Sequence, residues 1–156
     1  VFAIMNYAVD DNERPIFYKK VVETVVHEFC HSFTKIKGDT EKALEKSGKA
    51  LQEYTYFSMR RQAYGTWRNI LEESLVRAAT ICYLIDHDYD EKDIRNAIIE
   101  QVDRNFFWMP ELVQTLRYYE SHRKKYPTFT SFYPEIIRFF DRYVADVEKE
   151  IQKALK

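Results

Sequence analysis

Glycine, proline and cysteine are all scarce in this chain of 156 residues. With only three glycines and four prolines, few positions break a regular backbone, which favours long helices. The two cysteines, Cys30 and Cys82, are too few for a disulfide framework, and their apolar helical surroundings are typical of buried, reduced thiols. An apolar run of the roughly 18–20 residues that cross a bilayer is also missing, so we expect no membrane span in this chain.

Charge of one sign is not in excess either. Lysine and arginine number 24, aspartate and glutamate number 25, and the signs are interspersed along the chain. A net charge of −1 provides no electrostatic attraction for a nucleic acid, so we expect no nucleic-acid partner. Hydrophobic residues make up 46% of the sequence, enough to build the core of one soluble globular domain over residues 1–156. Neither charge nor composition indicates an oligomeric state.

The sequence starts at Val1 in the middle of a β-prone run, without a methionine or a signal segment. Either an N-terminal piece has been cleaved or the chain is a fragment of a longer protein. The β-prone run, Val1–Tyr7, predicts a short strand, and a polar turn is expected after it at Asp10–Arg14.

Apolar periodicity predicts helices for the rest of the chain. Apolar residues recur at helical spacing from Ile16 to Ile36, and Gly38 is expected to end this first helix. Five further helices are expected at about 40–60, 66–85, 90–104, 110–125 and 132–156. The predicted fold class is therefore mainly α, with about six helices and a short N-terminal edge strand.

The segment His27-Glu28-Phe29-Cys30-His31 carries a metal-binding pattern, HExxH. On a helix His27 and His31 stand one turn apart on the same face, so their imidazoles can bind one metal ion, for which Zn2+ is expected. Glu28 is placed to act as general base on a water at the metal. The predicted position in mid-helix, after a β-prone stretch, argues against a chance match. Cys30 points away from the histidine face and is expected to be a core thiol.

A catalytic zinc site uses a third protein ligand. The metzincin pattern would require glycine at position 34 and histidine at position 37, and Thr34 and Lys37 exclude it. The remaining solution is a glutamate from a later helix, for which Glu72 and Glu73 are the candidates. Periodicity does not choose between them, since the apolar stripe of their helix leaves both carboxylates at its sides.

Three segments together resemble an uncharacterised family of bacterial zincin-like, gluzincin-type proteins, a domain-of-unknown-function group. They are 27–33, 73–78 and 126–129, so the resemblance spans most of the chain. It implies an α+β zincin-like fold, a zinc ion bound by His27, His31 and Glu73, and an extracytoplasmic or secreted location. Two features depart from well-studied gluzincins. Glu73 lies farther from the motif than their third ligand does, and Arg77 stands where thermolysin-like enzymes have a carboxylate.

The predicted function is that of a zinc-dependent peptidase, in which Glu28 is the general base and the substrate is a peptide or protein. The GxMEN signature of zinc aminopeptidases is missing, which favours an endopeptidase. Tyr126, in a loop of the family-like stretch, is the expected donor to the oxyanion, with His122 and Tyr133 as other candidates. The alternatives are a non-catalytic zinc-binding or structural domain that retains HExxH, and a helical interaction module without a metal.

Overall fold

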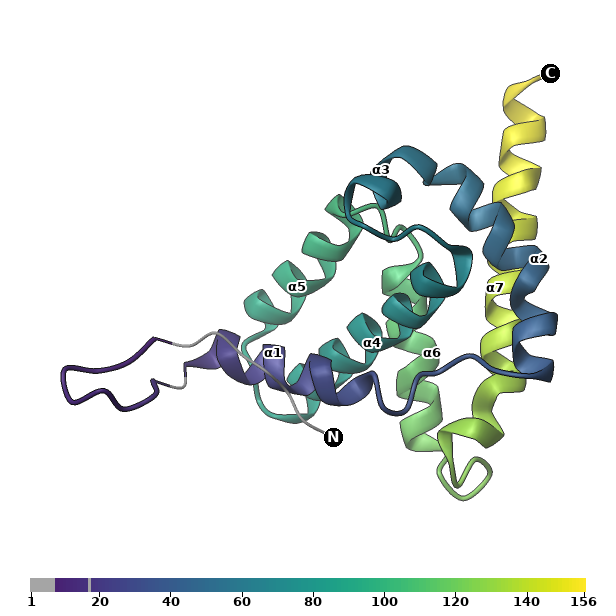
Figure 1. Ribbon diagram of the computed structural model, residues 1–156. Helices are drawn as coiled ribbons and strands as arrows, with labels where there is room; N and C mark the ends of the chain where they lie inside the picture. The colour runs from purple at the N-terminus through teal and green to yellow at the C-terminus, as the bar shows by residue number, and fades with distance from the viewer. Residues whose placement is uncertain (1–7, 17) are drawn as a thin grey trace.

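The computed structural model describes residues 8–16 and 18–156. This part of the chain forms seven helices: α1 (Lys19–Cys30), α2 (Asp39–Tyr54), α3 (Tyr56–Arg61), α4 (Trp67–Asp86), α5 (Glu91–Asp103), α6 (Met109–Ser121) and α7 (Phe129–Ala154) (Figure 1). The chain is thus mainly α, as predicted. The expected number of about six helices is wrong, because the stretch 40–60 is divided at Thr55 into α2 and α3. None of the helices in the described residues is both long and apolar enough to cross a membrane.

The predicted edge strand at Val1–Tyr7 lies outside the described residues. Within them, the one β pairing is an isolated antiparallel bridge between Val9 and Pro15. The polar turn expected at Asp10–Arg14 closes this bridge, and the Asp10 carboxylate accepts hydrogen bonds from the backbone amides of Asn12 and Arg14. Residues 8–16 project away from the helices beyond the start of α1 (Figure 1).

Helix α4 is the centre of the molecule, since it packs against α1, α2, α5 and α6. Its buried side chains are Ile70, Leu71, Glu73, Ser74, Leu75, Val76, Ala78, Ile81, Cys82 and Leu84. They occur on most sides of the helix, and such a helix is stable only when other elements cover it. Thr66 sets its start, because the Thr66 hydroxyl accepts a hydrogen bond from the backbone amide of Asn69.

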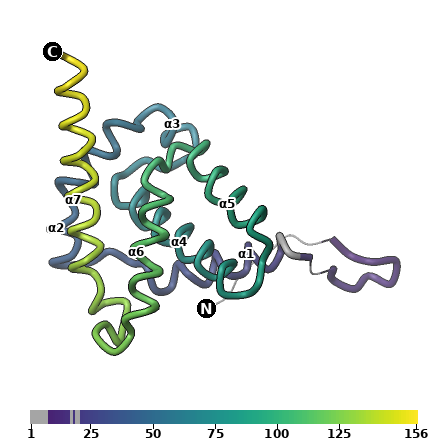
Figure 2. Tube along the Cα trace, turned by 180° about the vertical axis from the view of Figure 1, so that it is seen from behind, coloured from purple at the N-terminus to yellow at the C-terminus, as the bar shows by residue number. Residues whose placement is uncertain are grey.

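Helix α7 is amphipathic and lies along α2 and α6 in both views (Figures 1 and 2). Thr128 and Ser131 form a reciprocal capping box at its N-terminus, which explains why the helix starts before the expected residue 132. Its buried residues recur every three or four positions and are Phe132, Tyr133, Ile136, Phe139, Phe140 and Val144. Beyond Val144 no residue of α7 is buried, and the last turns extend past the other helices (Figure 1).

The first helix is shorter than the predicted 16–36, and HExxH lies in its last turn rather than in mid-helix. Helix α1 ends at Cys30, and the Thr34 hydroxyl caps it by donating to the Cys30 carbonyl. His31 is the C-cap residue, but its φ of −55° and ψ of −23° are still helical. The one-turn relation between His27 and His31, on which the metal prediction depends, is therefore preserved.

Two glycines hold positions that a side chain would disturb. Gly38 has a φ of +61° and is the N-cap of α2, so the expectation that it ends the first helix is wrong. Gly48 is buried in the middle of α2, where a Cβ atom would lie 2.5 Å from Cε3 of Trp67 on α4. The missing side chain lets α2 approach α4 closely.

We expect Gly48→Ala to lower the free energy of unfolding by about 1–2 kcal/mol. Overpacking against the rigid indole of Trp67 costs about 1–3 kcal/mol, which outweighs the gain of about 1 kcal/mol in helix propensity. Urea denaturation followed by circular dichroism measures the difference. Gly65→Ala is the matched control, because a Cβ atom there meets nothing within 4 Å. Equal stability of the two variants would contradict the close contact between α2 and α4.

Candidate metal centre

Helices α1 and α4 lie side by side, and the histidines of HExxH face a carboxylate of α4. The Nε2 atom of His27 is 3.4 Å from Oε1 of Glu73, and Nε2 of His31 is 3.7 Å from Oε2 of the same residue. The two imidazole rings have their centroids 5.1 Å apart and are nearly perpendicular. Of the two candidate glutamates, Glu73 is therefore the one whose carboxylate lies against both imidazoles.

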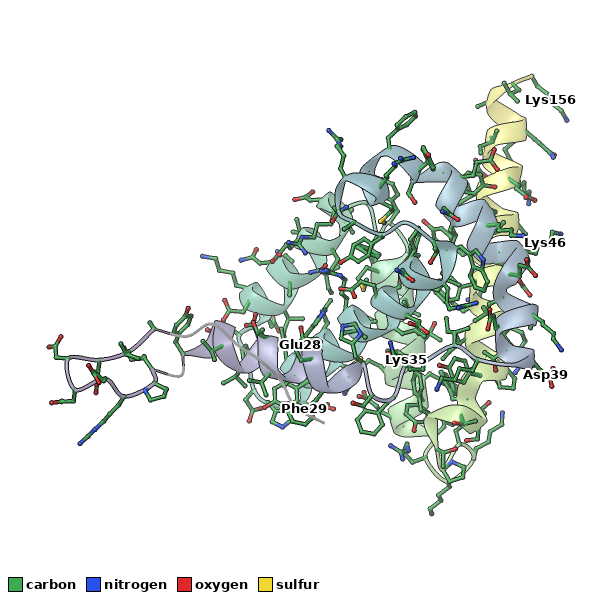
Figure 3. All side chains as sticks on the ribbon, in the orientation of Figure 1. Glu28, Phe29, Lys35, Asp39, Lys46 and Lys156 are labelled. Carbon is green, nitrogen blue, oxygen red and sulfur yellow. The ribbon has the colours of Figure 1, made fainter. Side chains whose placement is uncertain are left out.

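Glu28 completes the cluster from the exposed side of α1. His27, Glu28 and His31 each offer an atom that could bind a metal, and these three atoms lie within 4.8 Å of one another. Glu28 and Phe29 lie on opposite sides of α1 (Figure 3). The Glu28 side chain is exposed, so it is open to solvent and to ligands.

The Glu73 carboxylate is nearly buried and is held by Arg77, one turn farther along α4. Nη2 of Arg77 lies 2.8 Å from Oε1 of Glu73, and the side chains are only 11% and 10% exposed. A buried carboxylate without a partner is costly, and a paired, hydrogen-bonded one is stable in its ionised form. Arg77 thus compensates the charge of Glu73 and fixes its orientation.

Three further groups fix Arg77 in turn. Nη1 donates to Oε1 of Gln101 on α5 over 2.6 Å, and Nη2 donates to the hydroxyl of Tyr64 over 2.9 Å. The guanidinium also lies over the Phe106 ring, 5.1 Å from its centroid. Its buried Nε has no hydrogen-bond partner among the described residues. Side chains from the loop before α4, from α5 and from the loop after α5 thus determine where Arg77 points.

Burial and charge shift the pKa values of groups around this cluster. Burial lowers the pKa of His27, and Arg77 and His31 act in the same direction, against the opposing charge of Glu73. Burial also raises the pKa of Tyr64, as does the negative charge of Glu73. The pKa of the Cys30 thiol is likewise raised by burial. Cys30 is only half-buried, however, so the prediction of a core thiol is wrong for it, whereas Cys82 is buried as predicted.

Glu72, the other candidate ligand, has a different task. Its Oε1 accepts a hydrogen bond from the backbone amide of Ile36 over 2.9 Å, and Lys35 Nζ lies 3.4 Å from its Oε2. The Tyr133 hydroxyl donates to the Lys35 carbonyl over 3.1 Å. Glu72 and Tyr133 together anchor the segment between α1 and α2, away from the imidazoles.

The predicted oxyanion donor, Tyr126, is engaged in another part of the molecule. Its hydroxyl donates to the Glu135 carboxylate, which raises the pKa of Tyr126 and lowers that of Glu135. His122 is exposed and stacked on Tyr118, with its Nδ1 2.9 Å from the Tyr118 carbonyl oxygen. The described contacts therefore bring neither Tyr126 nor His122 to the HExxH cluster.

Tyr64 and Gln101 are parts of the site that sequence reasoning did not identify. Both reach the cluster through Arg77, from the loop before α4 and from α5. No local motif marks them, and Tyr64 is one of 12 tyrosines. The spacing of Glu73 and Arg77, four residues apart on a helix, allows Arg77 either to orient Glu73 or to form a surface ion pair with it, and does not by itself decide between the two.

The fold and the cluster define a mainly helical domain with a surface His-Glu-His group that faces a buried glutamate. Over residues 3–139 the chain matches the family described as domain of unknown function (DUF4932), and it belongs to that family. Comparisons with curated proteins and with solved structures give no match.

The pair of Glu73 and Arg77 allows a quantitative test. We expect Arg77→Met to lower the free energy of unfolding by about 3–5 kcal/mol, because it leaves a buried carboxylate without its partner. The double variant Glu73→Leu/Arg77→Met removes both charges and should recover most of that loss. Urea denaturation in the presence of a metal chelator gives the three free energies.

Arg104→Met is the matched control for Arg77→Met. Arg104 pairs with Glu100 at 3.7 Å, but both side chains are nearly half exposed, so its loss should cost less than about 1 kcal/mol. A cost for Arg77→Met as small as that of the control would mean that the buried pair does not stabilise the site.

Proposed function

We propose that this protein is a zinc-dependent peptidase whose metal is bound by His27, His31 and Glu73. The observation that carries the proposal is the convergence of both Nε2 atoms on the carboxylate of Glu73, with Glu28 beside them. Two imidazoles and a carboxylate, with one position left for water, form a common ligand set of catalytic zinc. That the fold is zincin-like is part of the same proposal.

The distances between the donor atoms support a fit to zinc. Two atoms that each lie about 2.0–2.1 Å from a tetrahedral ion are separated by about 3.3 Å. The separation of 3.7 Å between Nε2 of His31 and Oε2 of Glu73 is close to this value. Arg77 occupies Oε1 of Glu73 and leaves Oε2, on the side of His31, for a metal.

Each side chain has a distinct role in the proposed hydrolysis of a peptide bond. Zinc, when bound, supplies the Lewis acid that polarises the carbonyl and activates the attacking water. Glu28 would accept a proton from the water as its oxygen bonds to the carbonyl carbon, and would donate that proton to the amide nitrogen as the carbon–nitrogen bond breaks. His27, His31 and Glu73 hold the metal, while Arg77 keeps Glu73 in place.

A second candidate function is a non-catalytic zinc-binding or structural domain. The contact between Arg77 and Glu73 favours it, because a buried ion pair satisfies the carboxylate without any metal. The two functions differ in what they require of Glu28: the peptidase needs its carboxylate as general base, whereas a binding or structural domain does not, because the side chain is exposed and contributes little to packing.

Metal analysis and a cleavage assay with a library of fluorogenic peptides test the proposal. We expect about one zinc per chain. Loss of a residue that orients a metal ligand typically weakens metal binding by about 10–100-fold, so His27→Ala, which removes a ligand itself, should weaken zinc binding by more than that. Glu28→Gln should keep the zinc but reduce cleavage by about 10²–10⁴-fold, because it removes the general base.

His122→Ala is the control for these variants, since His122 is an exposed helix-end histidine outside the cluster. It should change neither zinc content nor cleavage. Zinc binding combined with equal behaviour of Glu28→Gln and the unmodified protein would favour the non-catalytic function. A protein that binds no zinc would contradict both.

A further inference from the structure

An apolar hollow lies where the end of α1 meets the loop between α6 and α7. It has a volume of about 460 Å³, and its lining includes Cys30 and Phe33 from the α1 side and Arg123 from the loop. Phe33 is 70% exposed although it lines the hollow, and Phe29, four residues before it, is 44% exposed. Exposed aromatic rings beside an apolar hollow form the kind of contiguous apolar surface that indicates a protein interface.

A basic loop borders this hollow. Residues 122–128 contain Arg123, Lys124 and Lys125 and no acidic residue. All three cations are exposed, and Arg123 lines the hollow. None of them forms an ion pair with another described residue, since the carboxylates of Glu120 and Glu135, which are close enough to act on them, are paired with other arginines. The loop thus presents three positive charges at the edge of an apolar surface.

A second loop, between α4 and α5, has the opposite charge. Residues 86–93 contain five carboxylates and one lysine. Asp88, Asp90 and Glu91 are exposed, and within the part of the chain that the structure describes they form no ion pair. The acidic loop therefore presents as many exposed carboxylates without an ion pair as the basic loop presents cations.

The packing of α4 against α6 brings the two loops to the same side of the molecule. The Trp108 indole, at the start of α6, donates to the Ser74 hydroxyl in the first half of α4, and Arg117 pairs with Asp86 at the end of α4. The two helices therefore run parallel, and the loops that follow them lie on one side, the lower side in Figures 1 and 2. Ala79, which lines the hollow, precedes Asp86 by seven residues, or about 10 Å of helix. Hollow, basic loop and acidic loop thus share one face.

A face with one basic and one acidic edge is complementary to a copy of itself. In a dimer with a two-fold axis through this face, the basic loop of each copy meets the acidic loop of the other, and the apolar surfaces meet between them. The net charge of −1 keeps the overall repulsion between two copies small. An anionic partner such as a lipid surface would attract the basic loop but repel the acidic one.

We propose that this face binds a second copy of the chain, with residues 122–128 of each protomer against residues 86–93 of its partner. Phe29 and Phe33 form the apolar part of the interface. The inference goes beyond the proposed function and does not depend on it. Because Glu28 and Phe29 lie on opposite sides of α1, the dimer leaves the candidate metal centre open (Figure 3).

Sedimentation velocity at increasing protein concentration tests the inference. We expect the unmodified chain to form dimers that dissociate as the salt concentration is raised, because exposed ion pairs are screened. Lys124→Glu/Lys125→Glu places two acidic loops against each other, and Asp88→Lys/Asp90→Lys places two basic loops against each other. Each reversal acts at both contacts of the symmetric dimer, so each should raise the dissociation constant by at least about 30-fold.

Mixing the two charge-reversed proteins is the decisive step. In a dimer of one copy of each, both contacts again join a basic loop to an acidic one, so the mixture should associate within about threefold of the unmodified affinity. The four substitutions combined in one chain should restore the dimer in the same way. Recovery in the mixture also shows that each variant is folded.

Matched variants on other elements locate the interface. Phe33→Ser should weaken the dimer by at least about tenfold, because it removes an apolar ring from the contact. Phe57→Ser is its control, since Phe57 is 81% exposed on α3, at the upper side of the molecule (Figure 1). Lys46→Glu/Lys149→Glu makes the same charge change on the exposed faces of α2 and α7 and should leave the affinity as it was.

Three outcomes would overturn the inference. A monomer at every concentration would mean that the face binds no second copy, and binding of that monomer to phosphatidylglycerol vesicles would assign the basic loop to a membrane instead. Charge-reversed variants that associate as the unmodified chain does would place the contact elsewhere. A mixture that fails to associate would show that the two loops do not face each other. Addition of a metal chelator should leave the dimer unchanged, so loss of the proposed zinc site and loss of the dimer are distinguishable.

Discussion

The ion pair between Glu73 and Arg77 is the interaction on which the candidate site depends. A carboxylate this far from solvent is stable in its ionised form only with a partner, and Arg77 provides one at 2.8 Å. Arg77 in turn requires Gln101, Tyr64 and the Phe106 ring, which come from different elements around α4. The packing of α5 and the two neighbouring loops against α4 therefore determines where Glu73 points toward the histidines of α1.

The parts of the site that could be predicted are those set by local geometry. HExxH fixes the relation of His27 and His31 through the pitch of one helix, and that relation holds although the helix ends at Cys30. The choice between Glu72 and Glu73 could not be made from periodicity. Adjacent residues on a helix point about 100° apart, and which of them faces α1 depends on how α4 is rotated in the packed domain. In the structure Glu72 holds the Ile36 amide, and Glu73 faces the imidazoles.

The difference between local helix geometry and packing between helices also explains the errors in the predicted fold. Existence and order of the helices follow from apolar spacing, and the starts of α4 and α7 are marked by capping threonines at 66 and 128. The break at Thr55 and the early end of α1 leave no such mark. Gly38 begins α2 and does not end the first helix: glycine is commonest just after a helix end, but it also occurs at N-caps, where Gly38 stands. Ile36, between α1 and α2, is buried, so the connecting segment is itself part of the core.

The graded burial of the site has a chemical consequence. The side chains of His27 and His31 are 23% and 33% exposed, while Glu73 behind them is 10% exposed. A group on the α1 side thus meets solvent, whereas the carboxylate lies in a medium of lower dielectric constant, where its charge acts more strongly. Arg77 compensates the charge of Glu73 and holds its Oε1 at 2.8 Å, so the carboxylate has a fixed position beside the imidazoles. This arrangement, with an open face on α1 and a fixed anion on α4, is what distinguishes the cluster from an ordinary surface pair of histidine and glutamate.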